Sequence, residues 1–295
     1  MARRRTAAAW AAAFGGLRIH RLGLHEICAA GGESRPKGAS IGGSSDILRW
    51  CVLGGYPELH AKALAPQAFY SDYMVTYLER DVRQIIRVHD LHDFERFLRL
   101  CAVRAGQLLS HQSLATDVGV GPNTVKHWIG LLETSGIIHL LQPYYRNIGK
   151  RLVKSPKLYF MDTGLLCYLL GIHSSAELLA NPMLGAIHEN LVLGQVARWY
   201  ANRGVEPQVF FYRDQRGAEV DFVIPVGPRL KLIEAKFSEN PPTDLPAMRA
   251  VEKAVGRANI ISRMVICPTA VHVRADAGGT ALANCIDLDP VLGPA

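Results

Sequence analysis

Two strand-like segments near the C-terminal third of the chain carry charged side chains that could do chemistry. They run from Gly217 to Ile224 and from Lys231 to Lys236, and both are rich in Val, Ile or Leu. Side chains alternate between the two faces of a strand, so Glu234 and Lys236, two residues apart, point the same way. If the segments pair as neighbouring strands, Asp221 lies beside them.

Two carboxylates next to an ammonium suit a magnesium ion and a phosphate. Mg²⁺ prefers oxygen ligands, and an amine beside it can hold a water molecule or a phosphate oxygen. These residues therefore predict a metal site at Asp221 and Glu234, with Lys236 next to it. A second interpretation stays open, in which the same charges are solvated strand ends that pair with one another.

The order Asp221, twelve residues, then Glu234-Ala-Lys236 resembles the core of the PD-(D/E)xK nuclease fold. In that fold a helix before the first strand often supplies a further acid, and the matching residue here is Glu189. The resemblance implies phosphodiester hydrolysis. Asp221 and Glu234 would bind Mg²⁺ directly and Glu189 through water, and Lys236 would hold the attacking water or stabilise the charged phosphorane.

The segment around Glu189 is predicted to be helical. Ile187, Leu191 and Trp199 recur near helical spacing between Gly185 and Tyr200. This pattern predicts an amphipathic helix with one apolar face.

Composition narrows the class of protein. A chain of 295 residues is longer than a usual single domain, and 49% hydrophobic residues suffice for packed cores. The formal charge of +7 favours a polyanionic partner such as DNA. Six cysteines without a C-x-x-C pair fit reduced thiols in a cytoplasmic protein. No apolar run approaches the roughly 18–20 residues that span a bilayer, so we expect no membrane partner.

Residues 94–141 have the order of a winged helix-turn-helix. A helix is predicted over 94–104, a short one over 110–117, a third over 123–135 and a strand over 137–141. In such a module the exposed face of the third helix meets the major groove. The residues predicted on that face are Asn123, Thr124, Lys126 and His127.

A basic stretch follows, with five Lys or Arg residues and no acid between residues 146 and 157. In a hairpin or wing these side chains would contact phosphates, which supply affinity without sequence preference. The alternative is a solvated hairpin that mediates protein contacts. The residues predicted to bind nucleic acid here are Arg146, Lys150, Arg151 and Lys154.

Taken as a series, several stretches resemble a family of prokaryotic AAA-type ATPases whose C-terminal part is known as domain of unknown function 4143. The resemblance covers roughly residues 17–270 and implies a P-loop ATPase domain, a winged helix and a nuclease-like α/β domain. The stretches that carry it are 53–58, 77–82, 157–165, 189–190, 217–222 and 234–236.

The sequence departs from that family in one respect. It contains no G-x-x-x-x-G-K-[ST] loop, whose backbone N–H groups would cradle the phosphates of a nucleotide. ATP is therefore not expected to bind, and the chain resembles a truncated member or a fragment. An exposed apolar edge left by the missing domain favours a homo-oligomer.

These observations predict an α/β protein, α+β overall, in three parts. Residues 1–66 are interpreted as a remnant of the ATPase domain with a loop. Residues 67–156 form a helical segment and winged helix, and 157–295 form a nuclease-like mixed sheet flanked by helices. The predicted function is DNA binding with Mg²⁺-dependent nuclease activity. The alternative is a non-catalytic regulatory module that binds nucleic acid or protein.

Overall fold

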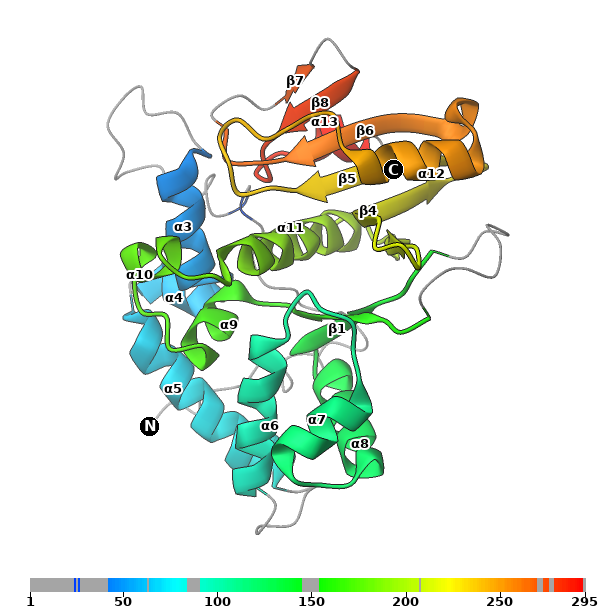
Figure 1. Cartoon of the computed structure of the whole chain (residues 1–295). Coiled ribbons are helices and arrows are strands. Elements are labelled where there is room, and N and C mark those ends of the chain that lie inside the picture. The colour runs from blue at the N-terminus through cyan, green and yellow to red at the C-terminus, as the bar shows by residue number, and fades with distance from the viewer. Residues whose placement is uncertain are drawn as a thin grey trace.

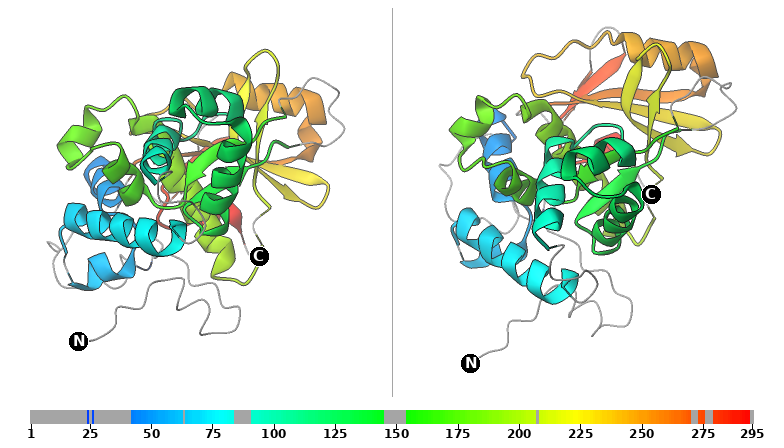
Figure 2. Two further views of the ribbon diagram at one scale, coloured as in Figure 1. Left: turned by 90° about the horizontal axis from the view of Figure 1, so that it is seen from below. Right: turned by 60° about the horizontal axis from the view of Figure 1, so that its bottom comes forward.

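A computed structural model shows a helical part and a mixed β-sheet, with one long helix between them (Figure 1). The structure describes Leu24, Glu26 and residues 42–62, 64–83, 91–144, 154–206, 208–269, 273–275 and 279–293. In the right view of Figure 2 the sheet lies at the top, and the helices of residues 57–77 lie toward the bottom. In these described ranges no helix is both long and apolar enough to cross a membrane. The mixed α/β class predicted from the sequence is confirmed.

The helical part begins with α3 (Ser44–Leu53), α4 (Pro57–Lys62) and α5 (Pro66–Tyr77). A single turn of π-helix over Leu78–Val82 follows α5. The sequence pattern predicted a helical segment over 67–100, but the described helices are separate. Residues 84–90 lie outside the description, and the next helix begins only at Leu91.

Three helices and a strand then follow in the order that the sequence predicted, and a second strand pairs with the first. They are α6 (Leu91–Val103), α7 (His111–Val118), α8 (Pro122–Thr134), β1 (Ile138–Leu141) and β2 (Lys157–Phe160). Ser110 caps α7 by accepting a hydrogen bond from the backbone N–H of Ser113. Gly119 ends α7 in the left-handed conformation, with φ of 88°. β1 and β2 pair antiparallel, with Ile138 opposite Phe160.

The chain continues through α9 (Thr163–Leu169) and α10 (Ser175–Leu179) into α11 (Leu184–Ala201). The predicted amphipathic face of α11 is wrong. Buried residues occur all around this helix, and they include polar Asn190 and Gln195. A helix that is buried on every side lies inside a protein, and α11 has the sheet on one side and the helical part on the other (Figure 1).

The sheet has six strands in the order β3-β4-β5-β6-β8-β7. Their bounds are β3 Phe210–Arg213, β4 Glu219–Val226, β5 Arg229–Ala235, β6 Ile260–Ile266, β7 Val273–Ala275 and β8 Thr280–Ala283. β3, β4 and β5 are antiparallel neighbours, whereas β5, β6 and β8 run parallel. A short 3₁₀-helix (Arg257–Asn259) leads into β6, and α13 (Asp289–Leu292) is the last described element.

Helices cover the two faces of this sheet with separate apolar clusters. Ile187 of α11 belongs to the same buried cluster as Phe222 and Ile233 of the sheet. On the opposite face, α12 (Pro246–Val255) places Met248 in a second cluster with Val223. The sheet is therefore a central layer, and α11 is the element that joins it to the helical part.

The helical part is held together around the carboxylate of Asp162, the N-cap of α9. One oxygen accepts hydrogen bonds from the Tyr70 hydroxyl and from Leu165 N–H, and the other accepts one from Gly55 N–H. α3, α5 and α9 meet here at very short range. A Cβ added to Gly54, which has φ of 75°, would lie 2.1 Å from the Tyr70 hydroxyl oxygen.

We therefore expect Gly54→Ala to lower the free energy of unfolding by more than about 2 kcal/mol, because it adds backbone strain and a clash. Chemical denaturation measures the change. Gly130→Ala in α8 is the matched control. A Cβ there meets nothing within 4 Å, and the change should raise stability by about 0.5–1 kcal/mol. Equal stability of Gly54→Ala and wild type would contradict this description of the junction.

Candidate active site

The candidate site lies where β4 and β5 separate. The last paired residues there are Phe222 and Ile233. Beyond this pair, a carboxylate oxygen of Asp221 accepts a hydrogen bond of 2.9 Å from the backbone N–H of Ala235. A carboxylate on one strand thus bonds the backbone of the next strand, which brings Asp221 beside the end of β5.

A bulge in β4 helps to place Asp221. Between β3 and β4, Phe210 pairs with Val223 but Tyr212 pairs with Val220, so β4 has one extra residue. Asp221 and Phe222 are the two residues that together oppose a single residue of β3. A bulge bends the strand and redirects a side chain. Simple alternation along the strand, which the sequence analysis assumed, does not hold at this point.

Glu234 and Lys236 lie side by side, with 2.7 Å between the Lys236 Nζ and a Glu234 carboxylate oxygen. The Glu234 side chain is 5% exposed, whereas that of Lys236 is 40% exposed. The carboxylate is thus buried and the ammonium reaches toward solvent. A buried acid beside an accessible amine is an arrangement that an anionic ligand could approach.

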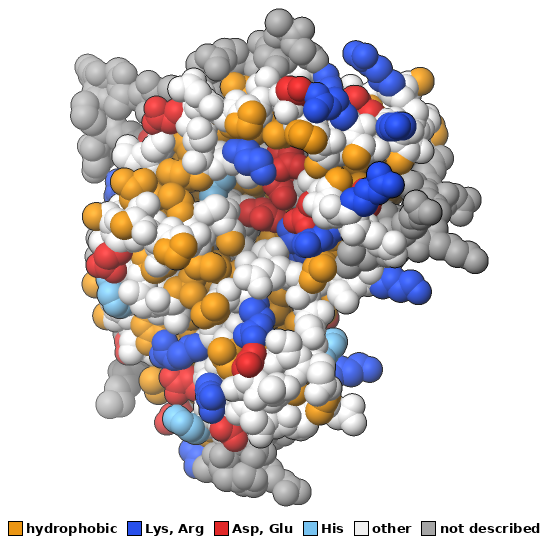
Figure 3. All heavy atoms as spheres, viewed as in Figure 1, with side chains coloured by type: hydrophobic (Ala, Val, Ile, Leu, Met, Phe, Trp, Pro, Cys, Tyr) orange, Lys and Arg blue, Asp and Glu red, His pale blue; other side chains and the backbone are white. Residues whose placement is uncertain are grey.

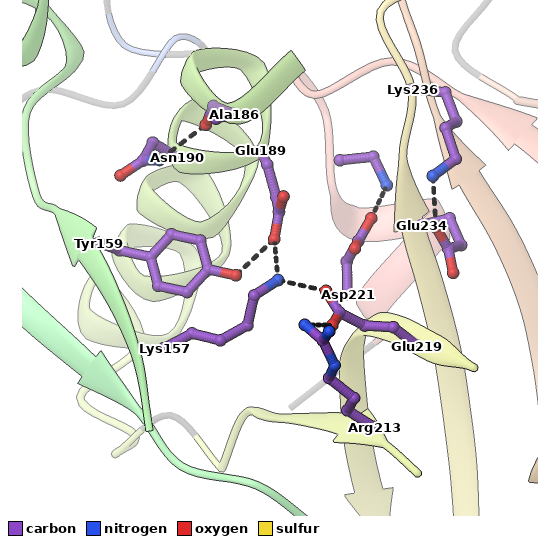
Figure 4. A network of polar contacts seen from close by, with 11 residues as sticks. Lys157, Tyr159, Ala186, Glu189, Asn190, Arg213, Glu219, Asp221, Glu234 and Lys236 are labelled. Carbon is purple, nitrogen blue, oxygen red and sulfur yellow. Dashed lines mark hydrogen bonds and ion pairs between the residues drawn. The ribbon is translucent and has the colours of Figure 1, made fainter. Parts of the chain in front are cut away.

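Glu189 comes from the first half of α11 and points toward the same place (Figure 4). Its Oε1 accepts a hydrogen bond from the Tyr159 hydroxyl and one of 2.8 Å from the Lys157 ammonium. Neighbouring Asn190 fixes α11 against β2, because its side-chain oxygen accepts from Phe160 N–H at 2.7 Å. The structure therefore brings together all four residues proposed from the sequence.

Lys157 is the residue that sequence reasoning missed. It belonged to the basic stretch predicted to contact phosphates from a hairpin or wing, with a solvated hairpin as the alternative, yet its side chain is only 2% exposed. Its ammonium also donates to Glu219 Oε1 at 2.7 Å, and Arg213 contacts the other Glu219 oxygen at 3.0 Å. A phosphate contact by Lys157 at the surface is excluded. The one available sequence signal was its position directly before the apolar run Leu-Tyr-Phe.

Burial and crowding of like charges shift the acidity of the site. Burial, and then the charge of Asp221, raise the pKa of Glu189 to about 7. Burial, and then the charge of Glu234, raise the pKa of Asp221 to about 7. Burial alone would lower the pKa of Lys236, but Asp221 and Glu234 outweigh it, so its pKa lies above the ordinary value. At neutral pH these two buried carboxyls therefore hold a proton more readily than ordinary carboxyls do, while the lysine stays charged.

The donor set fits a divalent cation in part. Asp221 and Glu234 are buried oxygen donors on neighbouring strands, and burial, followed by the charge of Glu234, raises the pKa of Asp221. Across the described residues, no group of three or more His, Cys, Asp or Glu is already arranged to hold a metal ion. Glu189 accounts for this, because its Oε1 is engaged by Lys157 and Tyr159.

Acidic side chains gather near the middle of one face of the molecule, below the sheet, with Lys and Arg around them (Figure 3). The residues predicted to read DNA lie elsewhere, on α8. All four of them, Asn123, Thr124, Lys126 and His127, are exposed. Lys154 is also exposed, whereas Arg146, Lys150 and Arg151 lie outside the described residues.

Two curated proteins are similar to most of the chain. The chain is 32% identical over 243 residues to the uncharacterized protein Rv2008c of Mycobacterium tuberculosis, and equally to the uncharacterized protein Mb2031c of Mycobacterium bovis. The match covers 80% of this chain and 54% of each relative, so the chain spans about half the length of the curated relatives it matches. No solved structure matches significantly.

Two family models match the chain, one for each of its main parts. Domain of unknown function 8612 matches residues 44–176, which include the helical part and both strands β1 and β2. Domain of unknown function 4143 matches residues 184–285, from the start of α11 to just beyond β8. The protein therefore carries a domain of unknown function 4143, which contains Glu189, Asp221, Glu234 and Lys236, preceded by a domain of unknown function 8612.

Proposed function

We propose that this protein binds DNA and hydrolyses phosphodiester bonds with the help of Mg²⁺. The observation that carries the proposal is the juxtaposition of buried Asp221 and Glu234 with the accessible ammonium of Lys236. The proximity of Glu189 on α11 to these residues supports it, because a helix acid before the first strand is what the sequence resemblance implies. The AAA-type ATPase relationship remains a proposal that rests on the sequence resemblance alone.

The roles follow from the positions of the side chains. Asp221 and Glu234 would hold the cation through their oxygens, and Glu189 lies near enough to contribute through water. When bound, Mg²⁺ would stabilise the negative charge that develops on the phosphate. Lys236, charged at neutral pH and 40% exposed, would hold the attacking water or a phosphate oxygen.

A second function is supported by the ion pairs themselves. Lys157 pairs with Glu189 and Glu219, and Lys236 pairs with Glu234. Such a network could serve a non-catalytic regulatory module whose charges hold the two domains together. In that case the site would neither bind a divalent cation nor cleave DNA.

The first prediction concerns cleavage. Asp221→Asn removes one cation ligand while it nearly preserves the size of the side chain. We expect it to slow the nicking of supercoiled DNA in Mg²⁺ or Mn²⁺ by roughly a hundredfold or more, since a metal contributes several kcal/mol to such a reaction. Glu206→Gln, at an exposed position before β3, is the control and should cleave like wild type. Equal cleavage by wild type and Asp221→Asn would end the nuclease proposal.

The second prediction concerns pH. Asp221 and Glu189 have pKa values near 7, above their ordinary range, so the folded protein holds protons that a cation must displace. The affinity for Mn²⁺ should therefore rise between pH 6 and pH 8, by up to about tenfold per pH unit for each proton displaced. Calorimetric titration at several pH values measures it. The absence of any Mn²⁺ binding would favour the structural network instead.

The third prediction concerns DNA. Lys126 is exposed on α8 and would contact a backbone phosphate if this helix enters the major groove. Lys126→Ala should weaken DNA binding several-fold and lower the slope of log affinity against log salt by about one. Lys253→Ala, an exposed lysine of α12, is the control.

The basic stretch gives a separate prediction. The double variant Lys150→Ala with Arg151→Ala should also lower the slope of log DNA affinity against log salt, because two cationic side chains are removed. If neither this variant nor Lys126→Ala changes the slope, α8 and the basic stretch would be assigned to protein contacts.

A further inference from the structure

The ammonium of Lys157 lies among three carboxylates inside the candidate site (Figure 4). Its Nζ lies 2.8 Å from Glu189 Oε1 and 2.7 Å from Glu219 Oε1, and the charge of Asp221 also acts on it. The three carboxylates come from α11 and β4, whereas Lys157 begins β2. A cation from the preceding domain thus enters the carboxylate cluster of the sheet domain.

The position of this ammonium is the one that a second metal ion would need. Glu189 Oε1 and Glu219 Oε1, the two oxygens that Nζ contacts, are donors of the type that a divalent ion would use. Two-metal sites for phosphodiester hydrolysis place a second divalent ion near the first. With Lys157 in this place, the ammonium would occupy the space between the two oxygens and would repel a second ion.

The charges of the cluster agree with a single divalent ion. The four carboxylates are Glu189, Glu219, Asp221 and Glu234, and the cations that contact them are Lys157, Lys236 and Arg213. Once a bound cation has displaced the protons from Glu189 and Asp221, all of these groups are ionised and their charges sum to one negative charge. One divalent ion would turn the cluster positive, as an approaching phosphate requires, whereas two ions would leave a large buried positive charge.

Lys157 is also held firmly. The side chain is 2% exposed and lies 5.6 Å from the ring centroid of Tyr159 and 5.8 Å from that of Phe211. Moving it away would leave Glu189 with only the Tyr159 hydroxyl and Glu219 with only Arg213 as partners, in a buried place where an unbalanced charge is unfavourable. An incoming metal ion is thus more easily accommodated beside Lys157, between Asp221 and Glu234, than in its place.

We propose that the ammonium of Lys157 occupies the position of a second metal ion, so that the site binds one divalent ion per chain. This inference rests on the proposed metal site and adds a positioning role for a residue of the preceding domain. Removal of the ammonium without loss of side-chain length should open the place to a second ion.

The experiment counts Mn²⁺ ions bound to the full chain, by electron paramagnetic resonance of free Mn²⁺ and by calorimetry, at pH 8. Wild type should bind one ion and Lys157→Met two. Thermal unfolding in the same buffers adds an independent measurement. Mn²⁺ should raise the melting temperature of Lys157→Met by several degrees more than that of wild type, because the second ion restores the missing charge.

Lys236→Met is the matched control. It makes the same substitution at the other lysine of the cluster, which does not bridge Glu189 and Glu219, and it should not gain a second ion. Two ions per wild-type chain, or one ion in both wild type and Lys157→Met, would overturn the role of Lys157 and leave the metal site intact. If Lys157→Met does not fold in the absence of metal, Mn²⁺ should restore its folding; failure to do so would also contradict the proposed role of Lys157. No binding by any variant would overturn the proposed function itself.

Discussion

The structure depends on one buried ion pair network centred on Lys157. Its ammonium joins β2 of the preceding domain to α11 and β4 of the sheet domain through Glu189 and Glu219. Burying a charged group costs desolvation free energy, which an ion pair compensates only when each group has well-placed partners. In this network both carboxylates have a second partner. Glu189 also accepts from Tyr159, and Glu219 contacts Arg213.

This network gives the two domains a shared functional region. The sheet domain supplies the acids, but β2, which pairs with β1 directly after α8, supplies Lys157 and Tyr159. α11 has the central place in this arrangement, because it is buried between the sheet and the helical part while it carries Glu189.

Much of the fold followed from local patterns. Glycine and proline marked the ends of helices around α7 and α8, and β-branched and aromatic runs marked β4 and β5. The acid-rich spacing from Glu189 to Lys236 singled out four residues that the fold brings together. Patterns failed where burial was decided by distant segments. α11 was predicted to be amphipathic, yet polar Asn190 is buried because its oxygen accepts a hydrogen bond from Phe160 N–H of β2.

The sequence by itself indicated β1, β4 and β5, the helices α6, α7, α8 and α11, and the chemical types available at the site, because hydrophobic spacing and turn residues act over a few positions. Only the tertiary structure decided that the Lys157 side chain points inward and that a bulge places Asp221 beside Ala235. It also decided that Glu189 Oε1 accepts hydrogen bonds from both Lys157 and Tyr159. The physical reason is that burial and charge pairing depend on segments dozens of residues apart. Lys157 and Glu219, for example, are 62 positions apart in the chain and 2.7 Å apart in space.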